Sequence, residues 1–143
     1  MKLGIVGHEA RKFTPQTEAA AKLAITGAIC LYKPELVISG ECPLGGIDIW
    51  AKEIAKALNI PFQPYPPKHN SWAKGYKPRN LQIANNSDLV LVIAVRSLPA
   101  TYTGMRFAEC YHCRNHGADG TNHIKGGGCW TAWKCKQRAW IFI

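Results

Sequence analysis

The fold class follows from the stretch Asp88-Leu89-Val90-Leu91-Val92-Ile93-Ala94-Val95. After the aspartate, every residue is apolar and several are β-branched, which favours a buried strand. A strand without polar positions on either face suits the centre of a parallel sheet that helices cover on both sides. The stretch therefore predicts an α/β protein rather than an all-β or all-helical one.

Strand and helix patterns alternate on both sides of this stretch. The predicted strands are residues 3–6, 35–38, 60–65 and 139–143, and the predicted helices are residues 14–31, 47–58, 79–86 and 130–138. Thr14 is a suitable N-cap and Pro15 suits the first helical position. Pro61 and Pro64 place the third strand at a sheet edge, because proline cannot donate to a central ladder.

The connecting segments complete the expected architecture. Residues 66–78, rich in proline, lysine and aromatics, are expected to form a loop. Residues 97–128 show no clean periodicity and are expected to be an insert within one domain of residues 1–143. The whole order predicts a three-layer Rossmann-like sandwich with a parallel sheet of about five strands.

Composition and charge restrict the kind of protein. The chain opens without the pattern of a secretory signal, and its longest apolar stretch, residues 89–95, is too short to cross a membrane. We expect a cytoplasmic protein without a membrane partner.

The net charge is +9, and residues 60–143 contribute most of the excess. This bias favours anionic partners such as phosphates, nucleotides or nucleic acid, although a solvated basic face is the alternative.

Three glycine-containing loops follow or precede predicted strands and helices at the edge where α/β sheets bind ligands. Glycines before a helix let the backbone approach a phosphate, and the helix N-terminus favours its charge. The candidate ligand-binding residues from these loops and from the start of the helix at residues 79–86 are Gly7, His8, Arg11, Ser39, Gly40, Gly45, Asp48, Arg79, Asn80, Gly127, Gly128 and Thr131.

Two of these residues allow alternative interpretations. Asp48 either stabilises the first turn of its helix or accepts a hydrogen bond from a ligand hydroxyl. Arg79 either clamps a phosphate with its planar fork or is a surface residue at a helix start, where a positive charge is slightly unfavourable.

The cysteines of the last third suggest a metal site. Cys110-x-x-Cys113 is a spacing that presents two thiolates to one ion, and Cys129 and His123 complete a tetrahedral set for a structural zinc. His116 is the alternative to His123. Cys135 is expected to be a packed core thiol. The alternative is that these are free thiols in an irregular loop.

The chain resembles a Rossmann-like superfamily that includes the lonely-guy phosphoribohydrolases and the nucleotide-binding domain of the DNA-processing protein DprA. The resemblance rests on Gly7, on the segment from Ser39 to Asp48, on Pro78-Arg79-Asn80 and on Gly126–Gly128 with Thr131. It is closest to small stand-alone, often phage-borne members, some of which carry a Cys-Tyr-His-Cys insert. The resemblance implies a nucleotide-like ligand. Lys134 stands where the phosphoribohydrolases have a glutamate, which argues against their reaction.

Three functions are consistent with these features. The first is a nucleotide-binding sensor, carrier or sequestering module with a structural zinc. The second is a hydrolase of a nucleoside phosphate or N-glycosidic bond, for which Glu41 and Asp48 are candidate carboxylates. The third is a nucleic-acid binder that uses the basic C-terminal half, with Trp72, Tyr76, Trp130 and Trp133 as candidate stacking residues.

Overall fold

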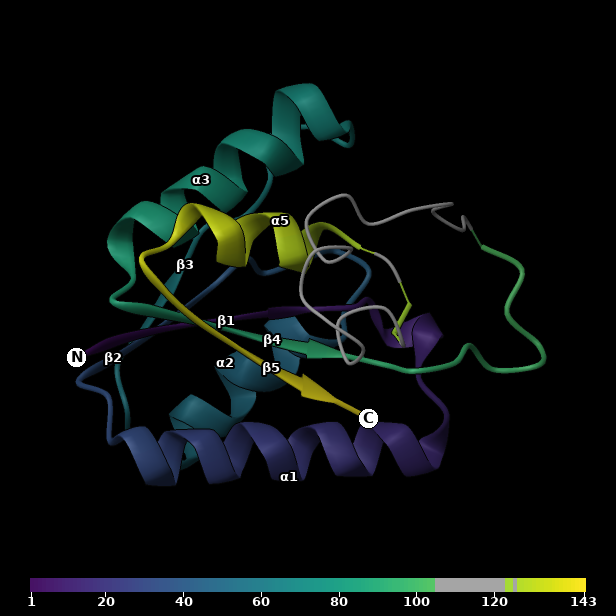
Figure 1. The fold of residues 1–143 in the computed structure, drawn as a ribbon, viewed down its shortest axis with the longest axis horizontal. Helices are drawn as coiled ribbons and strands as arrows, with labels where there is room; N and C mark the ends of the chain where they lie inside the picture. The colour runs from purple at the N-terminus through teal and green to yellow at the C-terminus, as the bar shows by residue number, and fades with distance from the viewer. Residues whose placement is uncertain (105–122, 125) are drawn as a thin grey trace.

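The structure is a computed structural model that describes residues 1–104, 123–124 and 126–143. Its strands form one parallel sheet with the order β3-β2-β1-β4-β5 (Figure 1). The strands are β1 (Lys2–Gly7), β2 (Leu36–Ser39), β3 (Phe62–Pro64), β4 (Leu89–Ala94) and β5 (Gln137–Phe142). The predicted five-stranded parallel sheet is confirmed, and β3 lies at its edge as the prolines indicated.

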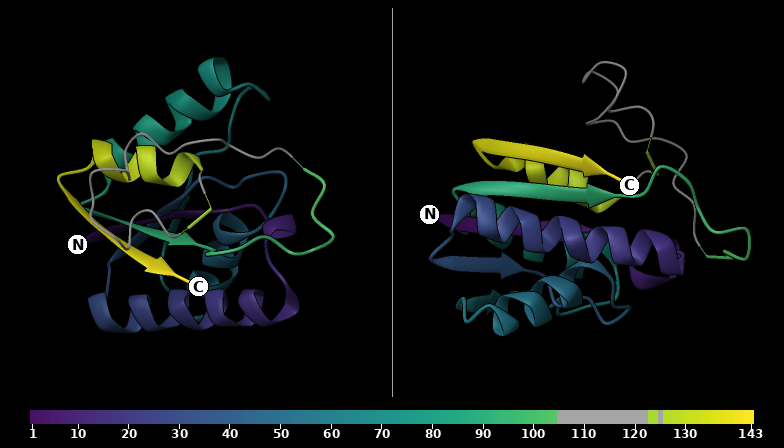
Figure 2. Two further views of the ribbon diagram at one scale, coloured as in Figure 1. Left: turned by 45° about the vertical axis from the view of Figure 1, so that its right-hand side comes forward. Right: turned by 90° about the horizontal axis from the view of Figure 1, so that it is seen from below.

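Helices cover both faces of this sheet (Figures 1 and 2). One face packs against α1 (Pro15–Tyr32) and α2 (Ile47–Ala57), and the other packs against α3 (Lys77–Asn86) and α5 (Gly127–Lys134). Every residue of β4 is buried. The apolar run after Asp88 is therefore an interior strand between two helical layers, and the three-layer sandwich is confirmed.

Local sequence signals explain where several elements begin. Thr14 is the N-cap of α1, its hydroxyl accepts from the Thr17 backbone N–H at 3.1 Å, and Pro15 is the first helical residue. Gly7 ends β1 at a point where any Cβ would overlap the carbonyl oxygen of Ile93. Only glycine allows this close approach between neighbouring strand ends.

Two predicted segments are wrong in their boundaries. Residues 66–78 are not only loop, because a π-helical turn, η2 (Trp72–Tyr76), leads directly into α3, which begins at Lys77. The last helix runs from Gly127 to Lys134 rather than over residues 130–138. Its glycines belong to the first helical turn, and Gln137 and Arg138 are instead the exposed start of β5.

The sheet order creates a switch point beside β1. The chain places β2 and β3 on one side of β1 and then crosses to place β4 and β5 on the other. In such sheets a crevice opens beyond the carboxyl ends of the two strands where the direction reverses. Here those ends are Gly7 and Ala94. None of the helices in the described part of the chain has the length and apolar character that crossing a membrane requires.

Candidate functional site

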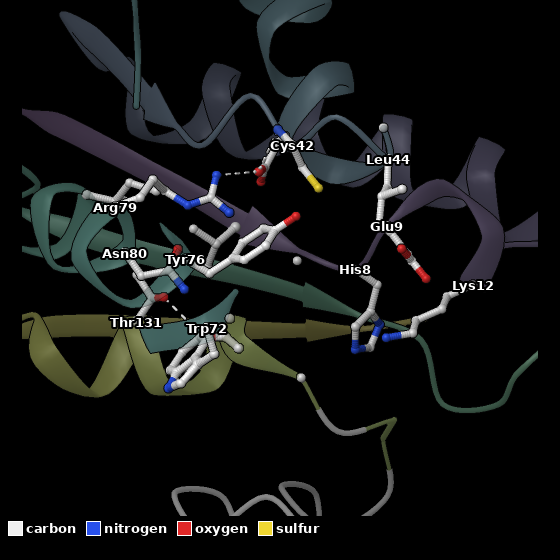
Figure 3. Close-up of a pocket in the computed structure, with 18 of the residues that line it drawn as sticks. His8, Glu9, Lys12, Cys42, Leu44, Trp72, Tyr76, Arg79, Asn80 and Thr131 are labelled. Atoms are coloured by element: carbon white, nitrogen blue, oxygen red, sulfur yellow. Dashed lines mark hydrogen bonds and ion pairs between the residues drawn. The ribbon is translucent and has the colours of Figure 1, made fainter. Parts of the chain in front are cut away.

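A pocket of about 450 Å³ lies at the carboxyl edge of the sheet (Figure 3). Its volume falls within the range of sites that hold organic ligands and is far larger than a free phosphate needs. Ten of the twelve candidate ligand-binding residues line it: Gly7, His8, Arg11, Gly45, Asp48, Arg79, Asn80, Gly127, Gly128 and Thr131. The loops that the sequence analysis singled out are therefore brought to one cavity.

The N-terminus of α5 forms one wall of this pocket. Gly126, Gly127 and Gly128 all line it. The N-cap residue, Gly126, has no side chain with which to satisfy the backbone N–H groups of the first turn. Those groups and the helix dipole favour a negative charge in front of them.

His8 lies beside this helix start. Its Nδ1 accepts a hydrogen bond from the backbone N–H of Val95 at 3.2 Å, which ties the end of β1 to the end of β4. Because a backbone N–H can only donate, Nδ1 must be unprotonated, and the ring proton of the neutral tautomer is on Nε2. A Cβ on Gly126 would lie 3.1 Å from Nε2. The donor edge of the ring therefore faces the glycine loop.

Lys12 is a buried pocket residue that sequence reasoning missed. Arg11, the predicted cation, has a side chain that is 61% exposed and that pairs with Glu9 at 3.5 Å. Lys12 is only 7% exposed. Burial lowers its pKa from 10.5, and the carboxylate of Glu9 partly opposes this effect. Both cations line the pocket, and the three-dimensional turn of η1 (Ala10–Lys12) decides which of the two is buried.

Asp48 and Arg79 form a buried ion pair on the opposite side of the pocket. Nη1 of Arg79 donates to Oδ2 of Asp48 at 3.2 Å, and both side chains are 8% exposed. The interpretation of Arg79 as a surface residue is therefore wrong. Burial raises the pKa of Asp48, whereas the charge of Arg79 and hydrogen bonds from Ser39 and the Cys42 backbone lower it.

The arginine keeps donors that the ion pair does not use. Its described hydrogen bonds all come from Nη1, which also lies 3.5 Å from the Tyr65 carbonyl oxygen. Nε is buried and has no hydrogen-bond partner among the described residues. Asp48 is in the first turn of α2, as one interpretation proposed, but its oxygens are used by protein donors rather than left for a ligand hydroxyl.

Ser39 and Gly40 lie behind the pocket wall rather than on its surface. The Ser39 hydroxyl donates to the Ile5 carbonyl and lies 3.1 Å from Oδ1 of Asp48. A Cβ on Gly40 would overlap Nη1 of Arg79. Both residues therefore position the ion pair and do not line the cavity. Glu41 also lies outside it, because its carboxylate pairs with Lys52.

The side chains of Trp72, Tyr76 and Cys42 also line the pocket. Trp72 and Tyr76 come from η2, and Tyr76 lies against the Arg79 guanidinium, which is 5.3 Å from the centre of the tyrosine ring. The thiol of Cys42 lies beside the Tyr76 hydroxyl, and burial raises the pKa of this thiol. In the view of Figure 3, Trp72 and Tyr76 lie between Arg79 on one side and His8 with Lys12 on the other.

Two of the four predicted zinc ligands are adjacent. Nε2 of His123 and Sγ of Cys129 are 3.3 Å apart, and both residues are buried. Nδ1 of His123 has no hydrogen-bond partner among the described residues. Cys110, Cys113 and His116 lie outside the described residues, and the described part of the chain contains no group of three metal-binding side chains. Cys135 is buried and its thiol is 3.4 Å from the Ser87 carbonyl oxygen, as expected of a core thiol.

Comparison with models of known protein families gives no match, and comparison with curated proteins finds no similar sequence.

Proposed function

We propose that the protein binds a nucleotide or nucleotide derivative in this pocket, as a sensor, carrier or sequestering module. The observation that carries the proposal is the meeting of His8, Lys12 and the N-terminus of α5 in one cavity. An ammonium group, an imidazole N–H and uncapped helix N–H groups are all donors to an anion. The volume of about 450 Å³ leaves room for the organic part of a nucleotide.

The phosphate is assigned to the α5 side of the pocket rather than to Arg79. The charge of Arg79 is balanced by Asp48 at 3.2 Å, so this wall is close to neutral. Lys12 and the glycines at the start of α5 line the same pocket, and the ammonium group of this buried lysine adds positive charge to the cavity. The remaining donors of Arg79 and the amide of Asn80 are then available to polar atoms elsewhere on the ligand.

The carboxylates that line the pocket favour a binding module over a phosphoribohydrolase-type enzyme, because they already accept hydrogen bonds from protein groups. Asp48 is committed to Arg79, Ser39 and Cys42, and Glu9 receives the Tyr102 hydroxyl at 3.3 Å. Lys134, at the position of the phosphoribohydrolase glutamate, does not line the pocket and lies over the Trp130 ring. Release of free base from a nucleoside monophosphate by the pure protein would favour the enzyme instead.

Calorimetric titration with adenosine, guanosine and uridine 5′-monophosphates and ADP-ribose tests the proposal. At least one should bind, and Lys12→Met should weaken it by about 1.5–3 kcal/mol, the range for a hydrogen bond to a charged group. Lys56→Met is the matched control, because it removes the same charge from an exposed position on α2. Equal losses in both variants would mean that only the overall positive charge attracts the ligand.

Nucleic-acid binding through the basic C-terminal half is the alternative function, and a titration with an oligonucleotide tests it. Several cations of this half lie over aromatic rings, among them Arg138 with its guanidinium carbon 3.7 Å from the centre of the Trp133 ring. A single-stranded oligonucleotide that binds at sub-micromolar concentration in physiological salt, with an affinity that falls steeply as salt rises, would favour this function over a small ligand.

We also propose a structural zinc held by Cys110, Cys113, His123 and Cys129. Zinc bonds of about 2.0–2.1 Å to nitrogen and about 2.3 Å to sulfur place two tetrahedral ligands roughly 3.5 Å apart. The His123–Cys129 separation of 3.3 Å is within a few tenths of an ångström of that value. Because Cys129 is in the first turn of α5, a metal there would fix the helix start that lines the pocket.

A further inference from the structure

Trp72 is an exposed aromatic residue on the wall of the pocket. It is 43% exposed although it is large and apolar, whereas Trp50, in the core, is 6% exposed. Exposed indole surface is unfavourable in water, and a tryptophan that lines a cavity offers its ring to a ligand. Asn80 lies near this ring, because a Cβ on Gly127 would be 3.0 Å from Cζ3 of Trp72 and 3.5 Å from Nδ2 of Asn80 (Figure 3).

The ring is held in place by its neighbours. Trp130 packs edge-on against it, with ring centres 5.3 Å apart and planes at 82°. Gly127 underlies it so closely that a Cβ there would be 3.0 Å from Cζ3 of Trp72. The Ser71 hydroxyl accepts the Lys74 N–H at 3.2 Å and caps the π-helical turn that carries the ring. Such turns often occur at functional sites.

We propose that Trp72 is the stacking surface for an aromatic nucleobase, and that the pocket recognises nucleotides through the base as well as through the phosphate. This inference rests on the proposed function. A purine or pyrimidine face stacks on an indole whichever base it is. Asn70 and Asn80, which also line the pocket, carry amides that both donate and accept at a base edge.

The test compares ligands that carry or lack the base. Adenosine 5′-monophosphate, ribose 5-phosphate and inorganic phosphate are titrated into the wild-type protein, Trp72→Ala and Trp72→Phe. Stacking on an aromatic side chain strengthens binding by about 5–150-fold. We expect the wild type to prefer adenosine 5′-monophosphate over ribose 5-phosphate by a factor in this range. Trp72→Ala should lose that preference, and Trp72→Phe should keep most of it.

The outcomes separate this inference from the proposed function. Equal affinities for the nucleotide and ribose 5-phosphate in the wild type would overturn the stacking role while leaving a phosphate site intact. A preference that survives in Trp72→Ala would also overturn it. If none of the three ligands binds, both the inference and the proposed function fail. The wild-type comparison uses no variant. The stacking role can therefore be refuted even if Trp72→Ala does not fold.

Discussion

The buried pair of Asp48 and Arg79 allows a quantitative test of the pocket's construction. Arg79→Met keeps a chain of similar length but leaves Asp48 without its counter-ion in a site that is 8% exposed. Removing one member of a buried pair costs about 3–5 kcal/mol. For a domain of this size, roughly 3–4 °C per kcal/mol gives a fall in melting temperature of about 9–20 °C.

A double-mutant cycle with Asp48→Asn separates the pair from other effects of the changes. The double variant has no buried charge, so it should be more stable than the sum of the two single losses implies, with a coupling energy of about 2 kcal/mol or more. Urea denaturation of the four proteins measures this coupling. Lys22→Met is the control, because its ion pair with Glu18 is exposed, spans 3.8 Å and should contribute about 0.5 kcal/mol or less. A coupling below roughly 0.5 kcal/mol would refute the buried-pair account.

Three further predictions concern the metal, a thiol and pH. Purified protein should carry about one zinc per chain, and Cys129→Ser should lower both metal content and melting temperature, whereas metal-free wild-type protein would refute the site. Cys42 should react with iodoacetamide more slowly than exposed Cys30, because burial raises the pKa of the Cys42 thiol. Adenosine 5′-monophosphate should slow the reaction of Cys42 further. Mass spectrometry measures both rates, and equal rates for the two cysteines would contradict the prediction. Because the pKa of Lys12 is lowered from 10.5, nucleotide affinity should fall as pH rises through that lowered value, and Lys12→Arg should abolish the fall; an unchanged fall in Lys12→Arg would exclude Lys12 as its cause.

The sheet was predictable because its signals are local. The apolar run of residues 89–95 predicts a buried strand by itself, and the Thr14-Pro15 pair predicts the start of a helix by itself. The start of α5 was harder to predict, because glycines usually interrupt helices. Here Gly127 and Gly128 occupy the first turn, where a Cβ would lie 3.0 Å from Cζ3 of Trp72 and 3.3 Å from Cγ1 of Val92, so that a larger side chain would have to displace these neighbours.

The pocket was predictable only in outline. Parallel strands bring their carboxyl ends to one edge, so the glycine loops had to meet there. The pairing of Asp48 with Arg79 joins residues 31 positions apart on two helices that cover opposite faces of the sheet. Whether Lys12 or Arg11 is buried depends on the direction of one short turn. Neither the ion pair nor the burial of Lys12 can be predicted from a local sequence pattern, because both arise from tertiary packing.

A crystal structure of the protein with adenosine 5′-monophosphate is the most direct test of nucleotide binding in this pocket. We expect the phosphate in front of the α5 N-terminus, within hydrogen-bond distance of the first-turn N–H groups, His8 and Lys12, with the base against Trp72. A nucleotide bound elsewhere on the surface, or an empty pocket in crystals grown with saturating nucleotide, would contradict it.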